Sequence, residues 1–193
     1  MTTICLVRHG ETDWNLKGKL QGRTDIPLNE AGILQAEECS EYLKSFVWDA
    51  LVTSPLMRAK QTAEIINIKI KVPLIEMEEF LERNYGDAEG LTLEERMRVY
   101  PDKIYPNQED QVSLRNRVMS GIEKIVEDFG ERRILLVAHG AIINGILANL
   151  SNGEIGSGKT KLMNACISSI HFHQEEWKIE NYNQISHLSC YNN

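Results

Sequence analysis

Short apolar runs alternate with longer stretches of helical periodicity along this chain. Each run is bounded by polar or turn residues and is too short for a helix, so we predict strands over residues 3–7, 50–53, 72–77 and 134–138. Pro73 interrupts the third run near its start. Residues 166–173 and 176–183 predict a hairpin that closes the fold.

Helical patterns fill the intervals between these runs. Asn29 is a predicted N-cap for a helix through about Phe46, whose apolar face carries Ala36, Cys39, Leu43 and Phe46. Four more helices are predicted: from a first turn at Pro55 to about Ile66, from a capping box of Thr92 and Glu95 to a point before Pro101, and over residues 114–129 and 141–150.

The alternation of strands and helices implies a parallel sheet that is covered by helices on both faces. We therefore predict an α/β fold, a three-layer α/β/α sandwich with a mostly parallel mixed sheet, to which the hairpin adds an antiparallel edge. No repeat, low-complexity tract or Pro/Gly/Ser-rich linker divides the chain. Residues 1–193 are accordingly expected to form a single domain.

Composition and charge narrow the classes of partner. The 193 residues are 42% hydrophobic and 25% charged, which is typical of a globular domain that buries a core without disulfides. Lys and Arg number 21 against 28 Asp and Glu, so the formal net charge is −7. An acidic chain without a basic run argues against nucleic acid or an anionic membrane as the main partner. A local cationic pocket for an anionic substrate stays open.

Cysteine usage and apolar runs bear on location. Cys5, Cys39, Cys166 and Cys190 form no CxxC pair, and scattered cysteines fit a reducing compartment. Arg8 cuts the N-terminal apolar run after a few residues, which argues against a signal peptide. Residues 134–150 read as a strand, a turn and a helix rather than a membrane span. The protein is therefore expected to be cytoplasmic.

Two of the predicted strands end in the same pattern, LVRHG at residues 6–10 and LVAHG at residues 136–140. Ligands of open α/β sheets bind beyond the carboxyl ends of the strands, so His9 and His139 are expected at one edge. A third strand leads to Arg58 at a helix N-terminus, and a fourth runs toward Glu82. With Arg8, these residues suit a phosphate ester: cations surround the oxyanion, a histidine attacks, and a carboxylic acid protonates the leaving oxygen.

Longer segments around these residues carry a family resemblance. LVRHGETDWN at residues 6–15 resembles the signature of the histidine phosphatase superfamily, also called the phosphoglycerate mutase-like family. GKLQG at 18–22, PLNEAG at 27–32, SPLMRAKQTA at 54–63, ERNYGDAEG at 82–90 and VAHG at 137–140 are similar to its further segments. They follow the family order from residue 4 to about residue 145.

The resemblance implies a histidine-type acid phosphatase, or phosphoglycerate mutase-like phosphatase, that hydrolyses small phosphate esters without metal or cofactor. His9 would attack phosphorus and become phosphohistidine. Arg8, Arg58 and His139 would neutralise the transferring phosphoryl group, and preorganised donors of this kind usually make the largest contribution to catalysis. Glu82 would protonate the leaving oxygen and then activate water.

The resemblance also assigns substrate binding to Asn15, Gln21, Gly22, Arg83 and Tyr85. The same catalytic set serves phosphatases and mutases, but mutases carry a longer insertion before the second histidine, so the short span of this chain favours hydrolysis. ERNYG at residues 82–86 is close to the mutase wording, and a 2,3-bisphosphoglycerate-dependent phosphoglycerate mutase stays open. A non-enzymatic phospho-ligand binding protein is the alternative from another class, although binding alone needs no general acid.

Two weaker patterns are decoys. Residues 153–160 satisfy the P-loop spacing G-x-x-x-x-G-K-[ST], but no strand precedes them and no helix follows, so we interpret them as a flexible loop. Lys159 or Lys161 of this loop could instead lean over the active site. His171 and His173 alternate along a strand, and we interpret them as a surface face rather than a metal site.

Overall fold

A six-stranded mixed sheet forms the centre of the computed structural model, which describes residues 1–191, and its strand order is β3-β2-β4-β1-β5-β6. The strands are β1 (Thr2–Arg8), β2 (Ala50–Thr53), β3 (Leu74–Glu76), β4 (Arg133–Ala138), β5 (Ile167–His173) and β6 (Glu176–Gln184). Strands β3, β2, β4 and β1 pair in parallel, whereas β5 pairs antiparallel with both β1 and β6. The predicted antiparallel edge is confirmed.

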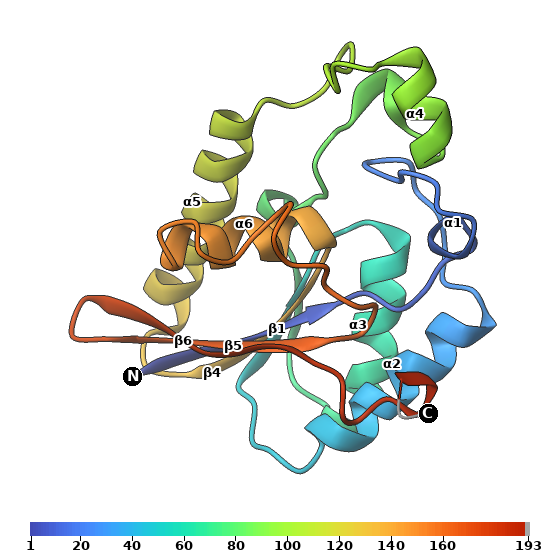
Figure 1. The fold of residues 1–193 in the computed structure, drawn as a ribbon. Coiled ribbons are helices and arrows are strands. Elements are labelled where there is room, and N and C mark those ends of the chain that lie inside the picture. Colours follow the sequence, from blue (N-terminus) through green and yellow to red (C-terminus); the bar gives the residue numbers. More distant parts are fainter. Residues whose placement is uncertain (192–193) are drawn as a thin grey trace.

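Helices cover both faces of this sheet, as Figure 1 shows. One face packs against α2 (Glu30–Leu43) and α3 (Met57–Ile70), and the other against α5 (Gln111–Phe129) and α6 (Gly140–Leu150). Alternate residues of the central strands enter the two cores, so Ile134 and Leu136 face α5 and α6 while Leu135 and Val137 face α2 and α3. The three-layer α/β/α prediction is confirmed.

Two short helices lie beyond the carboxyl ends of the parallel strands. Helix α1 (Asp13–Leu16) follows β1, and α4 (Leu93–Val99) stands near it in Figure 1. A backbone bridge between Lys19 and Thr92 joins the two segments. Thr92 and Glu95 form the predicted capping box. Turns of 3-10 helix at Glu78–Phe80, Gly86–Ala88 and Ser189–Tyr191 complete the elements.

Several predicted helix bounds are wrong: α3 ends at Ile70 rather than near Ile66, and α5 begins at Gln111 rather than at residue 114. Two further differences have a tertiary cause. Helix α2 ends at Leu43, and Phe46 lies beyond it with 42% of its surface exposed. Trp48 takes the buried place instead and donates from its indole nitrogen to the carbonyl of Leu43 at 2.9 Å. Helix α3 begins at Met57, two residues after Pro55, because the carboxylate of Asp25 accepts the Met57 N–H at 2.7 Å.

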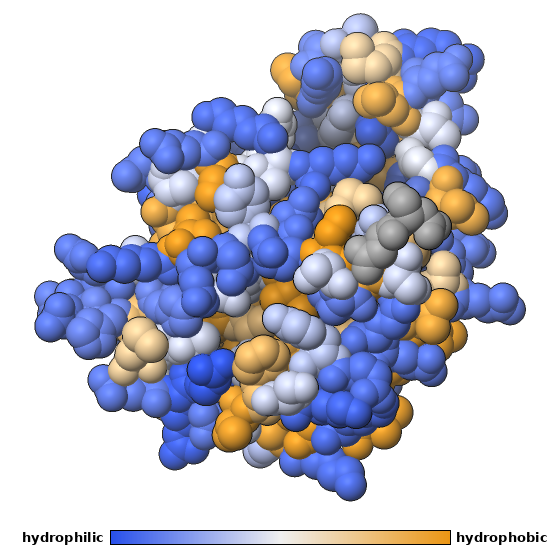
Figure 2. Space-filling model, turned by 60° about the horizontal axis from the view of Figure 1, so that its bottom comes forward, coloured by the Kyte–Doolittle hydropathy of each residue, from blue (hydrophilic) through white to orange (hydrophobic). Residues whose placement is uncertain are grey.

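Within residues 1–191, no helix is both long enough and apolar enough to cross a membrane. Figure 2 shows one face of the molecule, on which hydrophilic residues predominate and apolar residues occur in scattered patches. Such a distribution is ordinary for a folded domain.

Candidate active site

The two His-Gly strand ends lie side by side because β1 and β4 are parallel neighbours. Arg8 is in register with Ala138, and the N–H of His9 donates to the carbonyl of Ala138 at 3.0 Å. The rings of His9 and His139 have centroids 5.2 Å apart. The two segments that look alike in sequence therefore meet in space.

His9 is held as one tautomer by its own loop. Its Nδ1 lies 2.7 Å from the carbonyl oxygen of Gly10, which can only accept, so Nδ1 carries the proton and Nε2 has a free lone pair. The side chain is 2% exposed and lines a cavity. Burial, followed by the charges of Arg58 and Arg8, lowers the pKa of His9 well below its usual range. A neutral ring with a free lone pair on Nε2 has the form that a nucleophilic histidine requires.

His139 meets different partners. Its Nε2 lies 2.8 Å from the hydroxyl of Ser54, and its Nδ1 has no hydrogen-bond partner among the described residues. The residue caps helix α6 with extended backbone and is fully buried. Burial and then the charge of Arg58 lower the pKa of His139 well below its usual range. The buried ring nitrogen keeps an unused hydrogen-bonding position, although His139 is not among the residues that line the cavity.

Two arginines are buried beside these rings and are oriented by backbone carbonyls. Arg58 is 1% exposed, and its terminal nitrogens donate to the carbonyls of Thr24 at 3.0 Å and Gly22 at 2.7 Å. Arg8 donates to the carbonyl of Leu162 at 2.5 Å. The Nε atom of each arginine is buried without a partner in the described part of the chain. Unpaired cationic donors of this kind suit an oxyanion.

Glu82 lies at the same edge but not at the end of a strand. Strand β3 ends at Glu76, and a 3-10 turn intervenes before Glu82. The carboxylate accepts the N–H groups of Arg83 at 2.8 Å and Ala141 at 3.2 Å, so both oxygens are positioned. Burial raises the pKa of Glu82, against the opposing effects of the Arg83 N–H and the Arg58 charge. A buried carboxyl with a raised pKa can carry a proton.

A cavity of about 760 Å³ opens above these groups. Of the residues predicted from the sequence, it is lined by Arg8, His9, Asn15, Gln21, Gly22, Arg58, Glu82 and Tyr85. Arg83 is turned away from it. The guanidinium of Arg83 donates to the carbonyl of Glu109 at 3.0 Å and lies over the ring of Tyr85 at 5.2 Å. A cation that is already partnered in this way is positioned to hold the wall rather than a ligand.

Asn15 and Gln21 are arranged by Thr12. The Thr12 hydroxyl caps α1 and donates to the Oε1 atom of Gln21 at 2.9 Å, while the Oδ1 atom of Asn15 accepts the Thr12 N–H at 3.1 Å. Asn164 also donates to that oxygen, at 3.2 Å. With its oxygen engaged, Asn15 can present its amide N–H₂ group to the cavity.

Sequence reasoning missed the residues that hold this constellation in place. The Nδ2 group of Asn164 donates to the carbonyls of His9 at 3.1 Å and Gly10 at 3.3 Å. The carboxylate of Glu89 accepts the N–H groups of Arg23, Thr24 and Tyr85 and the Thr24 hydroxyl. No local pattern could have found either one, since their partners are up to 155 residues away.

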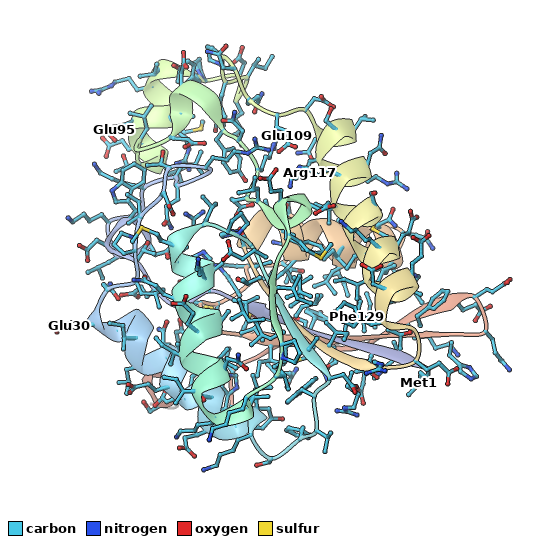
Figure 3. All side chains as sticks on the ribbon, turned by 180° about the vertical axis from the view of Figure 1, so that it is seen from behind. Met1, Glu30, Glu95, Glu109, Arg117 and Phe129 are labelled. Carbon is cyan, nitrogen blue, oxygen red and sulfur yellow. The ribbon has the colours of Figure 1, made fainter. Side chains whose placement is uncertain are left out.

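Arg117 fixes the backbone that leads to Glu82. It donates to the carbonyls of Glu79 at 2.7 Å and Leu81 at 2.8 Å and forms a two-point ion pair with Glu109. Figure 3 labels Arg117 on α5 and Glu109 just before it, and the two side chains lie close together there. The long amphipathic helix thus reaches the site through one arginine.

The two decoy patterns take ordinary roles. Residues 153–160 follow helix α6 as a series of turns, so the strand that a P-loop requires is absent at this point of the described chain. Residues 157–161 of this loop do line the cavity. His171 pairs with Glu180 at 2.8 Å on the hairpin, and no group of three potential metal-ligating side chains is found within residues 1–191.

Comparisons with known proteins agree with this geometry. The family model of the histidine phosphatase superfamily (branch 1) matches residues 4–185. The uncharacterized phosphatase PhoE of Bacillus subtilis (strain 168) is 54% identical and covers 98% of each chain. A metal-independent phosphoserine phosphatase of Arabidopsis thaliana is 32% identical over 98% of this chain and 84% of its own. The solved structure of YhfR from Bacillus stearothermophilus superposes with a TM-score of 0.91 at 25% identity, over 97% of this chain and 99% of its own.

The sequence motifs, the residues at the sheet edge and the similar proteins indicate the same family. The family model matches most of the chain, and one relative shares more than half of its residues. These matches identify the family to which the two His-Gly strand ends belong. The chain belongs to the histidine phosphatase superfamily.

Proposed function

We propose that this protein is a metal-independent phosphomonoesterase that hydrolyses small phosphate esters through a phosphohistidine on His9. One observation carries the proposal. The contact between Nδ1 of His9 and the Gly10 carbonyl at 2.7 Å leaves Nε2 as a neutral nucleophile beside two buried arginines. A histidine that needed only to bind phosphate would gain from being charged, whereas this one is kept neutral.

In the first step, Nε2 of His9 forms a bond to phosphorus as the bond from phosphorus to the ester oxygen breaks. Arg8, Arg58 and the unpaired ring nitrogen of His139 stabilise the charge on the phosphoryl oxygens, and Asn15 assists from the rim. The leaving oxygen takes the proton of Glu82. The alcohol then departs with a neutral hydroxyl.

In the second step, water replaces the alcohol beside Glu82. The carboxylate removes a proton from water as the water oxygen bonds to phosphorus, and the bond between phosphorus and Nε2 of His9 breaks. Inorganic phosphate leaves, and both residues return to their starting protonation states. Protein cations supply the charge that a metal provides in other phosphatases, so no metal or cofactor takes part.

The phosphatase proposal is favoured over mutase activity by the position of Arg83. A mutase must keep the doubly phosphorylated intermediate for a second phosphoryl transfer, and the resemblance would have Arg83 hold the carboxylate of the substrate. Here the guanidinium of Arg83 is bound to the Glu109 carbonyl and lies outside the cavity lining. The Arabidopsis thaliana relative is named a metal-independent phosphoserine phosphatase, which supports hydrolysis of a small phosphate ester here as well.

We further propose that one domain, residues 1–193, carries the whole reaction and works in the cytoplasm. The cysteines Cys5, Cys39 and Cys166 are buried free thiols and Cys190 is an exposed one, which suits a reducing compartment.

Phosphate release from p-nitrophenyl phosphate and 3-phosphoglycerate in EDTA tests the proposal. Wild type and His9→Ala are compared, with His173→Ala as the matched control because His173 is exposed and lies outside the cavity. Hydrolysis in chelator that disappears only in His9→Ala is expected. Isomerisation primed by 2,3-bisphosphoglycerate without hydrolysis would establish the mutase instead. Tight phosphate binding without turnover would establish a binding protein.

A further inference from the structure

The outer part of the cavity carries more positive charge than one phosphate needs. Its lining contains six basic side chains and, among the described residues, a single carboxylate, that of Glu82. Arg8 and Arg58 account for two of the six and belong to the phosphate floor. The other four come from three separate segments: Lys19, Arg96, Lys159 and Lys161. This concentration occurs in a chain whose net charge is −7.

The cavity also has room for more than a phosphate. Its volume of about 760 Å³ lies within the range of roughly 300–1,000 Å³ that is typical of pockets for whole small molecules. A phosphoryl group held by Arg8, Arg58 and His9 would occupy only the floor. The remainder of a substrate would therefore face the outer cations.

The outer cations differ in how far they are already engaged. The ammonium of Lys159 donates to the carbonyl of Gly153 within its own loop, and Lys19 lies over the ring of Trp14 at 5.8 Å. Arg96 is half-buried on α4, and one of its terminal nitrogens donates to the carbonyl of Leu91 at 2.9 Å. Most of its N–H groups are therefore still able to donate to a ligand. Lys161 is exposed at the cavity wall. Arg96 and Lys161 are the available pair.

The segment that bears Lys161 is tied to the catalytic floor. Arg8 donates to the carbonyl of Leu162 at 2.5 Å, next to Lys161. On the other side, Asn144 of α6 donates to the carbonyl of Thr160 at 3.4 Å, and Asn183 donates to that of Lys161 at 3.2 Å. The backbone at Lys161 and on both sides of it is thus anchored, so its side chain begins from a fixed place relative to Arg8.

We propose that Arg96 and Lys161 form a second anion subsite, which binds a carboxylate or a second phosphate on the same molecule as the phosphate that is cleaved. The preferred substrates are then phosphate esters with two anionic groups. This inference rests on the proposed phosphatase function and deepens it. It assigns the second anion to α4 and the 157–161 loop rather than to Arg83.

Two matched substrate pairs test the subsite on wild type. Glycerol 3-phosphate and 3-phosphoglycerate differ by a hydroxymethyl and a carboxylate group, and fructose 6-phosphate and fructose 1,6-bisphosphate differ by one phosphate. We expect kcat/KM to be about tenfold higher for the doubly anionic member of at least one pair, the effect of one charge-assisted hydrogen bond. The pair with the larger ratio identifies the second anion. Equal values within both pairs would overturn the proposal.

Charge-removing variants test which residues are responsible. In the double variant Arg96→Gln, Lys161→Gln, the preference should fall to within about twofold, while kcat/KM for the singly anionic members stays nearly unchanged. Lys178→Gln is the control, because it removes an exposed charge on β6 outside the cavity. A preference that survives in the double variant contradicts the assignment to these two residues.

A binding measurement separates this inference from the proposed function. Titration calorimetry of His9→Ala with the same pairs should give a Kd about tenfold lower for the doubly anionic ligand, and the double variant in that background should lose the difference. A binding preference without turnover in wild type would refute the phosphatase and retain the subsite. Turnover of all four compounds with no preference in either assay would refute the subsite and retain the phosphatase.

Discussion

The two His-Gly strand ends of this protein begin alike and finish differently. LVRHG and LVAHG end neighbouring parallel strands in register, and both histidines are buried. After His9 the chain enters a loop whose first carbonyl, that of Gly10, accepts a hydrogen bond from Nδ1. After His139 it enters helix α6 directly, and the hydroxyl of Ser54, the residue that follows β2, lies 2.8 Å from Nε2. The comparison teaches that two alike strand ends acquire different hydrogen-bond partners, and in the proposed mechanism these partners separate the attacking histidine from the one that stabilises charge.

Replacing each histidine by alanine should show the largest difference between the two strand ends. His9→Ala removes the nucleophile, so we expect kcat for p-nitrophenyl phosphate to fall by about 10⁴-fold or more. His139→Ala removes one donor and should cost roughly 10²–10³-fold. Mass spectrometry of enzyme quenched in base, in which the bond between phosphorus and nitrogen is stable, should still find a phosphoenzyme in His139→Ala. Its absence there, with a phosphoenzyme in His9→Ala, would reverse the two assignments.

Glu82 sharpens the comparison because the first turn after His139 positions it, through the N–H of Ala141 at 3.2 Å. In Glu82→Gln the leaving oxygen receives no proton, so alkyl phosphates should slow by roughly 10²–10⁴-fold. p-Nitrophenyl phosphate, whose leaving group needs little protonation, should slow far less. Values of kcat/KM for glycerol 3-phosphate and p-nitrophenyl phosphate give the ratio. This quantity reports the first phosphoryl transfer alone and leaves out the later hydrolysis, in which Glu82 activates water for both substrates. Equal slowing of both substrates would contradict the acid assignment.

The partners of the two rings offer a smaller and matched test. Asn164→Ala frees the carbonyls of His9 and Gly10, and Ser54→Ala frees Nε2 of His139. Each is expected to lower kcat by about tenfold, since it loosens a positioned group without removing it. Rapid-quench kinetics should place the loss in phosphoenzyme formation for Asn164→Ala. Asn164→Gln should restore little, because its longer side chain misplaces the amide.

The pH dependence of the free energy of unfolding gives the smallest expected effect, and both histidine rings contribute to it in the same direction. Both histidines have a folded-state pKa below the unfolded value of about 6.5, so the unfolded chain binds more protons below that pH. As the pH falls below 6.5, each of the two histidines should therefore lower the free energy of unfolding by about 1.4 kcal/mol per pH unit. Glu82, whose folded pKa is raised, acts with the opposite sign as protonation sets in.

Urea unfolding between pH 7.5 and 5.5 measures this slope. In His9→Asn and in His139→Asn the decline of stability on acidification should be shallower than in wild type, and His173→Asn serves as the exposed control. Parallel slopes in wild type and both buried-site variants would show that the rings are protonated in the folded state.

The sequence predicts those features of this protein that rest on local patterns. Strand positions follow from apolar runs, and the ends of parallel strands bring His9, His139 and Arg8 together. Predictions that depend on tertiary packing are less successful. Phe46 is exposed because Trp48 fills its place, and the guanidinium of Arg83 lies outside the cavity lining, where it donates to the carbonyl of Glu109.

The supporting residues were not predictable for the same reason. Asn164 lies 155 residues from His9, and Arg117 lies 36 residues from Leu81. Asparagine and arginine at these positions resemble any polar surface residue in the sequence. Only the folded chain shows that their side chains hold backbone carbonyls of the site.

The carboxylate of Glu89 has a consequence for engineering. It binds residues 23 and 24 and the N–H of Tyr85, while the carbonyls of Gly22 and Thr24 orient Arg58. A Cβ at Gly22 would meet that carboxylate at 1.9 Å, so this corner admits no side chain in its present form. Library design can therefore divide the cavity into a fixed module around Glu89, Gly22 and Arg58 and a variable module on α4 and the 157–161 loop. Diversity confined to the second module would change which esters are recognised and keep the phosphoryl chemistry.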